Sequence, residues 1–212
     1  MRKKSDIRYN ERYNEMEEKL SEFVKTKKCH GNTSDSNRNS IKSRGGYKMK
    51  DYIKLNEDRW NHVKNDYTKP LTHEELEEVR KNPISVALTV GKKVPIEWFE
   101  KANGKKILGL ACGGGQQGPI FAVKGYDITI MDFSASQLQR DGMVAEREGL
   151  KINTVQADMT KPFPFADETF DIIFNPVSNV YIEDLENMYQ EASRVLKKGG
   201  LLMVGFMNPW IY

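Results

Sequence analysis

The most regular pattern in the chain begins after residue 105, where short apolar runs alternate with segments of helical spacing. The runs predict five strands, over residues 107–111, 126–132, 152–156, 170–175 and 201–206. The segments between them predict helices that end near 124, that span 134–148 with Ser134 as the cap, and that span 182–196. Runs that are apolar throughout are typical of parallel strands covered on both faces. The pattern therefore predicts an α/β fold with a doubly wound, mainly parallel sheet.

Residues 49–104 predict shorter helices ahead of this sheet. The first is indicated by four large apolar residues at helical spacing, Tyr52, Leu55, Trp60 and Val63. Thr72 and Glu75 have the spacing of a capping box at the start of a second helix. Pro95 suits the first turn of a third, short helix over 95–100. This segment is predicted to be an N-terminal helical part of the domain that occupies 105–212.

Residues 1–48 differ in composition from the rest of the chain. They hold 13 Lys/Arg and 7 Asp/Glu, a net charge of +6, whereas the remaining residues carry a net charge of −3. Residues 5–28 have helical spacing, and residues 29–46 are polar with little to bury, as in a disordered linker. We expect a basic, partly disordered extension that is separate from the domain. The charge alone is weak evidence for nucleic-acid binding.

Composition excludes several classes of protein. The 212-residue chain has no run of 18 apolar residues, which excludes a transmembrane helix, and its first residues lack the apolar core of a secretory signal. The two cysteines, Cys29 and Cys112, are too few for a disulfide framework or a zinc cluster. We therefore expect a cytoplasmic protein without a metal site, in which Cys112 is a small buried filler.

The strongest local motif is Cys112-Gly113-Gly114-Gly115-Gln116-Gln117-Gly118, which follows a predicted strand and opens a helix. Glycines there allow a sharp turn and a close approach of a ligand to the backbone. Asp132 ends the next strand, where a carboxylate can accept hydrogen bonds from both ribose hydroxyls of an adenosine. The loop also reads Gly-x-Gly-x-x-Gly, so a nicotinamide cofactor stays open on this motif alone.

Further features, in order, resemble the class I S-adenosylmethionine-dependent methyltransferases, specifically the type 11 methyltransferase domain. They are the glycine loop, Asp132, Asp158-Met159, Phe170-Asp171 and the turn Lys197-Lys198-Gly199-Gly200. The resemblance covers about half of the chain, over 106–208. It implies a Rossmann-like fold and S-adenosyl-L-methionine as the cofactor. It also implies a set of cofactor-binding residues: Ala111, Gly113, Gly115, Gln116, Gln117, Asp132, Phe133, Asp158, Met159 and Asn175.

The chain departs from the family's usual acid-x-Gly-x-Gly-x-Gly loop. The corresponding residues are Gly109, Ala111, Gly113 and Gly115, so glycine replaces the acid and alanine the first glycine. Losing the acid removes one anchor near the methionine part of the cofactor. Hydrogen bonds from the two glutamines that follow the glycines could compensate.

The resemblance places the substrate side after the fourth strand, where Asn175, Asn179 and Tyr181 are candidate contacts. A tight-turn role is equally open for Asn179 and Tyr181. The sequence after Asn175 is Pro176-Val177-Ser178, which is not the Asn-Pro-Pro-aromatic signature of DNA-base amino methyltransferases. We therefore expect a small-molecule acceptor and no nucleic acid or membrane partner. Trp60 and Tyr67 could cover the cofactor or simply pack.

A full sheet of this family has seven strands, and five are predicted here. We expect that the last two are missing and that the exposed edge of the fifth strand promotes self-association. The leading interpretation is methyl transfer from S-adenosyl-L-methionine to a small molecule. The alternatives are a truncated, catalytically defective remnant that at most binds the cofactor, and a less favoured NAD-dependent oxidoreductase.

Overall fold

A computed structural model describes residues 52–63, 69–89, 92–102 and 104–206, all within one unit, Tyr47–Tyr212. The helix expected over 5–28, the linker over 29–46 and Tyr67 lie outside the described residues. The proposed domain boundary at residue 48 therefore stays a prediction.

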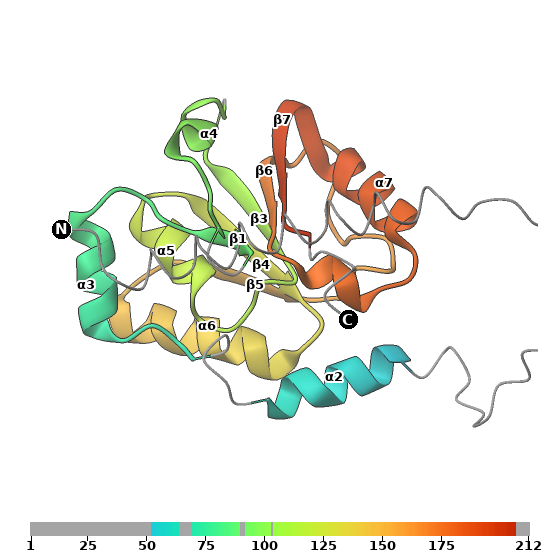
Figure 1. Cartoon of the computed structure of the whole chain (residues 1–212), viewed down its shortest axis with the longest axis horizontal. Coiled ribbons are helices and arrows are strands. Elements are labelled where there is room, and N and C mark those ends of the chain that lie inside the picture. Colours follow the sequence, from blue (N-terminus) through green and yellow to red (C-terminus); the bar gives the residue numbers. More distant parts are fainter. Residues whose placement is uncertain (1–51, 64–68, 90–91, 103, 207–212) are drawn as a thin grey trace, which may run out of the picture. The chain divides into compact units, whose positions relative to one another are not determined.

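The described chain is built around a five-stranded sheet in the order β5-β4-β3-β6-β7. Its strands are β3 (Lys106–Leu110), β4 (Asp127–Asp132), β5 (Asn153–Gln156), β6 (Phe170–Asn175) and β7 (Leu196–Val204). All neighbouring pairs are parallel, and β3 lies in the middle (Figure 1). The predicted α/β, doubly wound, Rossmann-like architecture is confirmed.

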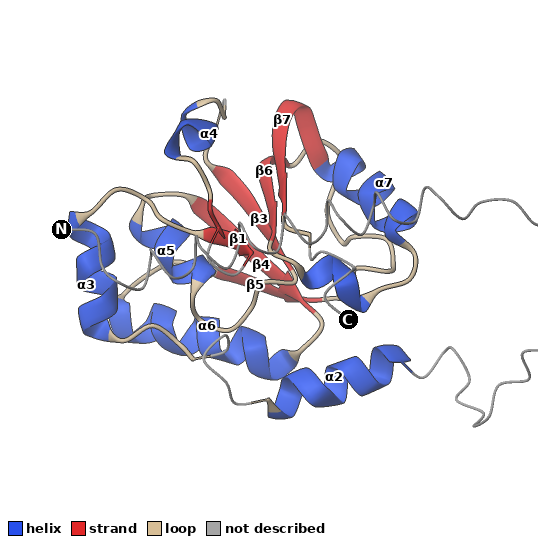
Figure 2. Cartoon of the chain, in the orientation of Figure 1, coloured by secondary structure: helices blue, strands red, loops and turns tan. Residues whose placement is uncertain are grey.

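Helices cover both faces of the sheet (Figure 2). The helices that cover it are α4 (Ile96–Glu100), α5 (Gln117–Val123), α6 (Ala135–Glu148) and α7 (Leu185–Val195). Two further helices lie outside this layer: α2 (Tyr52–His62) packs against α6, and α3 (His73–Lys81) packs against α5. One buried cluster joins residues of α4, α5 and α6 to the sheet, and a second joins residues of α7 to its other face. A small hairpin of β1 (Ala87–Thr89) and β2 (Lys92–Lys93) precedes α4 and was not predicted from the sequence.

Two predicted helix caps are confirmed. Thr72 and Glu75 form a complete capping box at the start of α3. The Ser134 side chain accepts a hydrogen bond from the Gln137 N–H at the start of α6. These local signals fix where both helices begin.

The start of the last strand was predicted wrongly. Residues 197–200 were expected to close the preceding helix, but α7 ends at Val195 and β7 begins at Leu196. Leu196 pairs with Phe170, and the register then shifts so that Leu201 pairs with Ile172. The segment between forms a bulge, in which Gly199 has a φ of 75°. Pairing with β6 thus overrides the local helix-ending signal.

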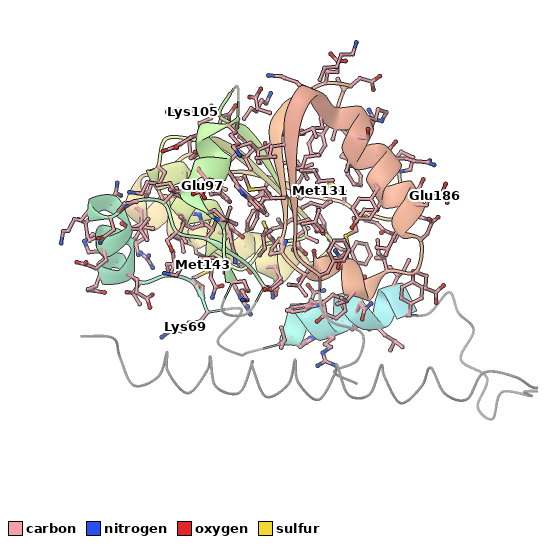
Figure 3. The ribbon with its side chains drawn as sticks, turned by 45° about the horizontal axis from the view of Figure 1, so that its top comes forward. Lys69, Glu97, Lys105, Met131, Met143 and Glu186 are labelled. Carbon is pink, nitrogen blue, oxygen red and sulfur yellow. The ribbon has the colours of Figure 1, made fainter. Side chains whose placement is uncertain are left out.

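The layers are filled by side chains that pack between sheet and helices (Figure 3), among them Met131, which is 1% exposed. In the described part of the chain β7 has a strand on only one side. Leu202 and, just past the strand, Phe206 are exposed there. Self-association through this edge stays a prediction. None of the described helices is long and apolar enough to cross a membrane.

Phe121 is the centre of an aromatic cluster beneath α5. It is fully buried and contacts the rings of Phe99, Tyr126 and Phe174 at centroid distances of 6.0, 5.8 and 5.2 Å. We expect Phe121→Ala to lower the free energy of unfolding by about 3–5 kcal/mol, because it leaves a cavity in the core. Denaturant unfolding measures this. Phe206→Ala, at a 60% exposed phenylalanine, is the matched control and should change stability little; equal losses in both variants would contradict the packing described.

Candidate functional site

The carboxyl ends of the parallel strands bring polar residues to one edge of the sheet. The chain runs outward from β3 through β4 to β5, then crosses to β6 on the other side of β3. This reversal makes the carboxyl end of β3 the topological switch point, where open α/β sheets bind ligands. Four predicted site residues follow or end the strands that meet there: Ala111, Asp132, Asp158 and Asn175.

The glycine loop after β3 makes a sharp turn. Ala111 has a φ of 48° and donates its N–H to Met131 O at 2.7 Å, which ties the start of the loop to β4. Gly114 and Gly115 have φ values of 127° and 76°, which favour glycine. Gly113 serves a different purpose, since a Cβ there would lie 2.9 Å from the Cβ of Gln137. It allows the loop to approach α6 closely.

Asp132 holds the loop from the end of β4. Its Oδ2 accepts the Gly113 N–H at 3.0 Å, and its Oδ1 accepts the Ser134 N–H at 2.9 Å. Burial raises the pKa of Asp132, and these backbone donors offset part of that rise. Each carboxylate oxygen has a further lone pair, so the carboxylate can still accept hydrogen bonds from a ligand.

A second carboxylate, which sequence reasoning missed, lies under the same loop. Asp141 of α6 is fully buried, and its Oδ2 accepts the Gly114 N–H at 2.9 Å. Its Oδ1 is buried without a hydrogen-bond partner in the described part of the chain. Burial raises the pKa of Asp141 to about 7, and the nearby Asp132 charge adds to this rise. The sequence offered one signal for it: Asp141 is a charged residue at an inward-facing, otherwise apolar position of the helix predicted over 134–148.

The two glutamines of the loop do not act alike. Gln116 donates its side-chain N–H to Lys69 O at 2.9 Å, and Leu71 donates its N–H to Gly115 O at the same distance. These bonds hold the segment before α3 against the loop. Gln117 is the first residue of α5 and is half-buried. Gln116 was expected to compensate for the missing acid by bonding the cofactor, but its side-chain N–H already donates to Lys69 O.

The residues after β4 and β5 form the next part of the edge. Asp158 Oδ1 accepts hydrogen bonds from the backbone N–H and the hydroxyl of Thr160, both at 2.8 Å. Met159 is half-buried and packs against the cluster beneath α7. Phe133 is half-buried, and its carbonyl accepts a hydrogen bond from Gln156. Met159 and Phe133 are the apolar side chains at this side of the loop.

On the other side of β3 the edge is formed by the turn after β6. Asn175 is fully buried and donates to Leu110 O at 2.9 Å and to the Ser178 hydroxyl at 2.7 Å, while its Oδ1 is buried without a partner among the described residues. Val177 has a φ of 56°, which is strained for a β-branched residue and is often found at functional sites. Asn179 is buried and donates to Gly205 O at 3.0 Å, so it ties this turn to β7.

Helix α2 connects the two sides of this edge. Asn61 accepts the Ser134 hydroxyl at 2.7 Å, next to Asp132. The Trp60 ring packs edge-on against Tyr181, with centroids 5.4 Å apart, and Asn56 donates to Tyr181 O at 3.1 Å. Tyr181 belongs to a short 3-10 helix, η3 (Ser178–Tyr181). Helix α2 therefore contacts both the Asp132 side and the Asn175 side of the site through Asn61 and Trp60.

Neither described histidine belongs to this edge. His62 is exposed and bonded through Nδ1 to Asp58 O in its own helix. His73 is exposed and lies 3.0 Å from Glu148. In the described ranges no group of three or more His, Cys, Asp and Glu could hold a metal ion.

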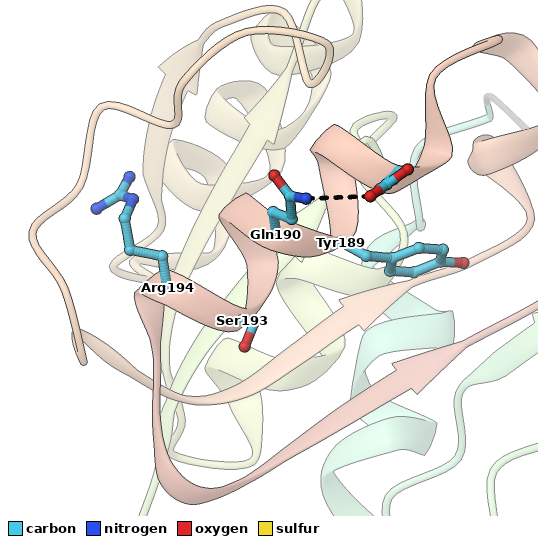
Figure 4. Close-up of a pocket in the computed structure, with 5 residues that line it drawn as sticks. Tyr189, Gln190, Ser193 and Arg194 are labelled. Carbon is cyan, nitrogen blue, oxygen red and sulfur yellow. Dashed lines mark hydrogen bonds between the residues drawn. The ribbon is translucent and has the colours of Figure 1, made fainter.

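Two surface pockets lie away from the strand ends. One is lined by residues of α7 alone (Figure 4): Glu186, Tyr189, Gln190, Ser193 and Arg194. The other lies beside α6, between Pro70 and Arg147. Neither includes a residue of the glycine loop, so we place the candidate site at the strand ends, where backbone donors and carboxylates converge.

Part of this chain is similar to known proteins. The model of the methyltransferase domain family matches residues 108–204, from β3 to the end of β7. The uncharacterized methyltransferase YbaJ of Bacillus subtilis is 43% identical over 148 residues, 70% of this chain. Residues 108–204 therefore form a methyltransferase domain.

The methyltransferase domain also resembles other proteins over shorter stretches. A sterol 24-C-methyltransferase of Gibberella zeae is 38% identical over 104 residues, 48% of this chain and 27% of that protein. The match to YbaJ spans 58% of the length of YbaJ. Among solved structures, the PH0226 protein of Pyrococcus horikoshii is 27% identical, with a TM-score of 0.49 over 55% of this chain and 52% of that one.

The raised pKa of Asp141 predicts a specific pH dependence of stability. Between about pH 4 and 7 the unfolded chain loses the Asp141 proton while the native state keeps it, so ionisation destabilises the native state as pH rises. We expect Asp141→Asn to gain stability relative to the parent chain across this window, by more than about 1 kcal/mol. Urea unfolding at pH 4, 5.5 and 7 measures the difference. Asp127→Asn, at the exposed start of β4, is the control; the same pH-independent difference for both variants would contradict the burial of a titrating Asp141.

Proposed function

We propose that this chain transfers a methyl group from S-adenosyl-L-methionine to a small-molecule acceptor. The observation that carries the proposal is the convergence of the glycine loop, Asp132, Asp158 and Asn175 at the switch point of a methyltransferase domain. A reducing, cytoplasmic location is part of the proposal, and the buried thiol of Cys112 is compatible with it.

The residues present suit an adenosine-containing cation. The close approach at Gly113 provides backbone without a side chain, and Asp132 provides a carboxylate acceptor for ribose hydroxyls. Asp158 has one oxygen committed to Thr160 and a second with no bond in the described part of the chain, and Met159 and Phe133 add apolar surface for a base. On the β6 side of the site, the buried Oδ1 of Asn175 has no partner among the described residues and can accept a hydrogen bond from a ligand.

When bound, the cofactor would supply an electrophilic methyl group, which an acceptor nucleophile attacks as the sulfur departs with the bonding electrons. The chain's part is then to hold and orient, and well-oriented reactants can lower a barrier by up to about 7–11 kcal/mol. Asn175 and Val177 would shape the floor beside the transfer site, and Trp60 with Tyr181 would exclude water from above it. Both described histidines are engaged elsewhere, so the proposal does not assign a histidine base.

A small molecule is the favoured acceptor class. The relatives include proteins named sterol 24-C-methyltransferases and a demethylmenaquinone methyltransferase, which are named for small, largely apolar acceptors. The turn after β6 lacks the Asn-Pro-Pro-aromatic signature that favours a nucleic-acid base. Val180 and Tyr181 are exposed beside this turn and provide apolar surface of the kind such acceptors require.

Calorimetry with two ligands tests the cofactor directly. We expect S-adenosylhomocysteine to bind the purified chain and NAD to show no heat of binding, because the chain matches a methyltransferase domain from β3 onward. Binding of NAD in preference would favour the oxidoreductase alternative. Binding of S-adenosylhomocysteine without methyl transfer to any member of a small-molecule acceptor panel would favour the catalytically defective alternative.

Asp132 is the residue on which the cofactor assignment most depends. We expect Asp132→Ala to weaken the affinity for S-adenosylhomocysteine at least tenfold, because each charge-assisted hydrogen bond contributes about 1.5–3 kcal/mol. Calorimetry measures the affinity, and thermal unfolding checks that the variant is folded. The control Asp127→Ala removes an exposed carboxylate from the opposite end of β4 and should bind normally. Unchanged affinity in Asp132→Ala would place the ribose elsewhere.

A further inference from the structure

Asp141 is the most unusual polar group in the described part of the chain. Its side chain comes from the middle of α6, a helix that otherwise presents Leu138, Val144 and Ala145 to the interior together with Gln137. The carboxylate is fully buried, bonds the Gly114 N–H and leaves Oδ1 without a partner. Burying a carboxylate costs folding free energy, so its presence at this position calls for a structural explanation.

The strand side of the loop provides that reason. The resemblance leads one to expect an acid at position 109, but a Cβ at Gly109 would lie 2.5 Å from the Sγ of Cys112 and 2.6 Å from the Cδ1 of Ile130. The Cys112 thiol therefore occupies the space that an acidic side chain on β3 would need. A side chain at position 109 would require Cys112 and Ile130 to move.

The helix side is shaped to accept the carboxylate instead. A Cβ at Gly118, in the first turn of α5, would lie 2.7 Å from Asp141 Oδ1. Gly118 therefore leaves the room in which the Asp141 carboxylate lies. The two glycines thus make room for different side chains. The missing side chain at Gly109 leaves space for the Cys112 thiol, and the missing side chain at Gly118 leaves space for the Asp141 carboxylate.

We propose that Asp141 is a positioning residue for the cofactor, which holds the glycine loop from α6 in place of the acid that is absent at position 109. The proposal rests on the proposed function, because the loop is taken to bind S-adenosyl-L-methionine. Asp141 acts through the Gly114 backbone: its carboxylate fixes the orientation of this peptide group and so the shape of the loop.

The ionisable groups that face Asp141 in the described chain are the Asp132 carboxyl at the end of β4 and the Cys112 thiol in the loop. Gly118 of α5, where an added Cβ would lie closest to Asp141 Oδ1, carries no charge. The Asp132 charge raises the pKa of Asp141, the N–H groups of Gly114 and Gly115 lower it, and burial raises the pKa of Cys112. Ionised Asp141 is the stronger acceptor for the loop, because charge-assisted hydrogen bonds are stronger than neutral ones.

The first test measures the affinity for S-adenosylhomocysteine by calorimetry between pH 6 and 8.5. We expect Asp141→Ala to bind at least tenfold more weakly than the parent chain, and Asp141→Asn to recover at least part of the loss because its amide oxygen can accept the Gly114 N–H. The affinity of the parent chain should rise at least threefold across this pH range, and the affinity of Asp141→Asn should change less. Glu146→Ala, at an exposed acid of the same helix, is the matched control and should behave as the parent chain does.

A double-mutant cycle tests the spatial relation between Asp141 and Gly118. We expect Gly118→Ala to weaken binding in the parent chain, because the new methyl group displaces the Asp141 carboxylate. In the Asp141→Ala background the same substitution should cost much less, because the closest atom is gone. Equal effects of Gly118→Ala in both backgrounds would contradict the arrangement.

A third readout does not depend on the proposed function. In the ligand-free chain the Gly114 amide proton should titrate in NMR spectra with an apparent pKa near 7 and lose this titration in Asp141→Asn. If the parent chain does not bind S-adenosylhomocysteine but Gly114 titrates as expected, the cofactor assignment fails and the hold on the loop stands. If the parent chain binds, but Asp141→Ala is folded and binds equally well, the positioning role is overturned. A Gly114 amide that does not titrate would overturn the contact itself.

Discussion

Two carboxylates under one glycine loop, Asp141 fully buried and Asp132 half-buried, are the constraint on which the rest of the site depends. Backbone N–H groups turned inward by a tight loop need acceptors, and Asp132 and Asp141 supply them to Gly113 and Gly114. Burial raises the pKa of both carboxyl groups, and the Asp132 charge raises the pKa of Asp141 further.

The fold provides this constraint through its topology. Because β3 is central and the chain reverses beside it, the loop after β3 is flanked by the ends of β4 and β6. Helix α6 follows β4 directly and returns across the same face, which brings Asp141 under the loop 27 residues after Gly114. The Trp60 ring of α2 packs against Tyr181 after β6, so α2 lies along the side of the site that faces away from the sheet.

Much of the sheet and the outline of the site could be predicted from the sequence, because they follow from local patterns. Apolar runs placed β6 correctly, and the caps at Thr72 and Ser134 fixed two helix starts. The start of β7 at Leu196 was missed because pairing with Phe170 overrides the signal of the following lysines and glycines. Asp141 was missed because its role depends on which side of α6 faces the loop, a long-range contact that periodicity cannot assign to a polar residue.

We propose that the strand ends around the glycine loop bind S-adenosyl-L-methionine. The most direct measurement is an NMR titration of the isotope-labelled chain with S-adenosylhomocysteine, followed at individual backbone amides. We expect saturable shifts concentrated in the loop over 111–117, around Asp132–Ser134 and around Asp158, with little change along the α7 pocket (Figure 4). Saturable shifts confined to α7, with the loop amides unchanged, would contradict it.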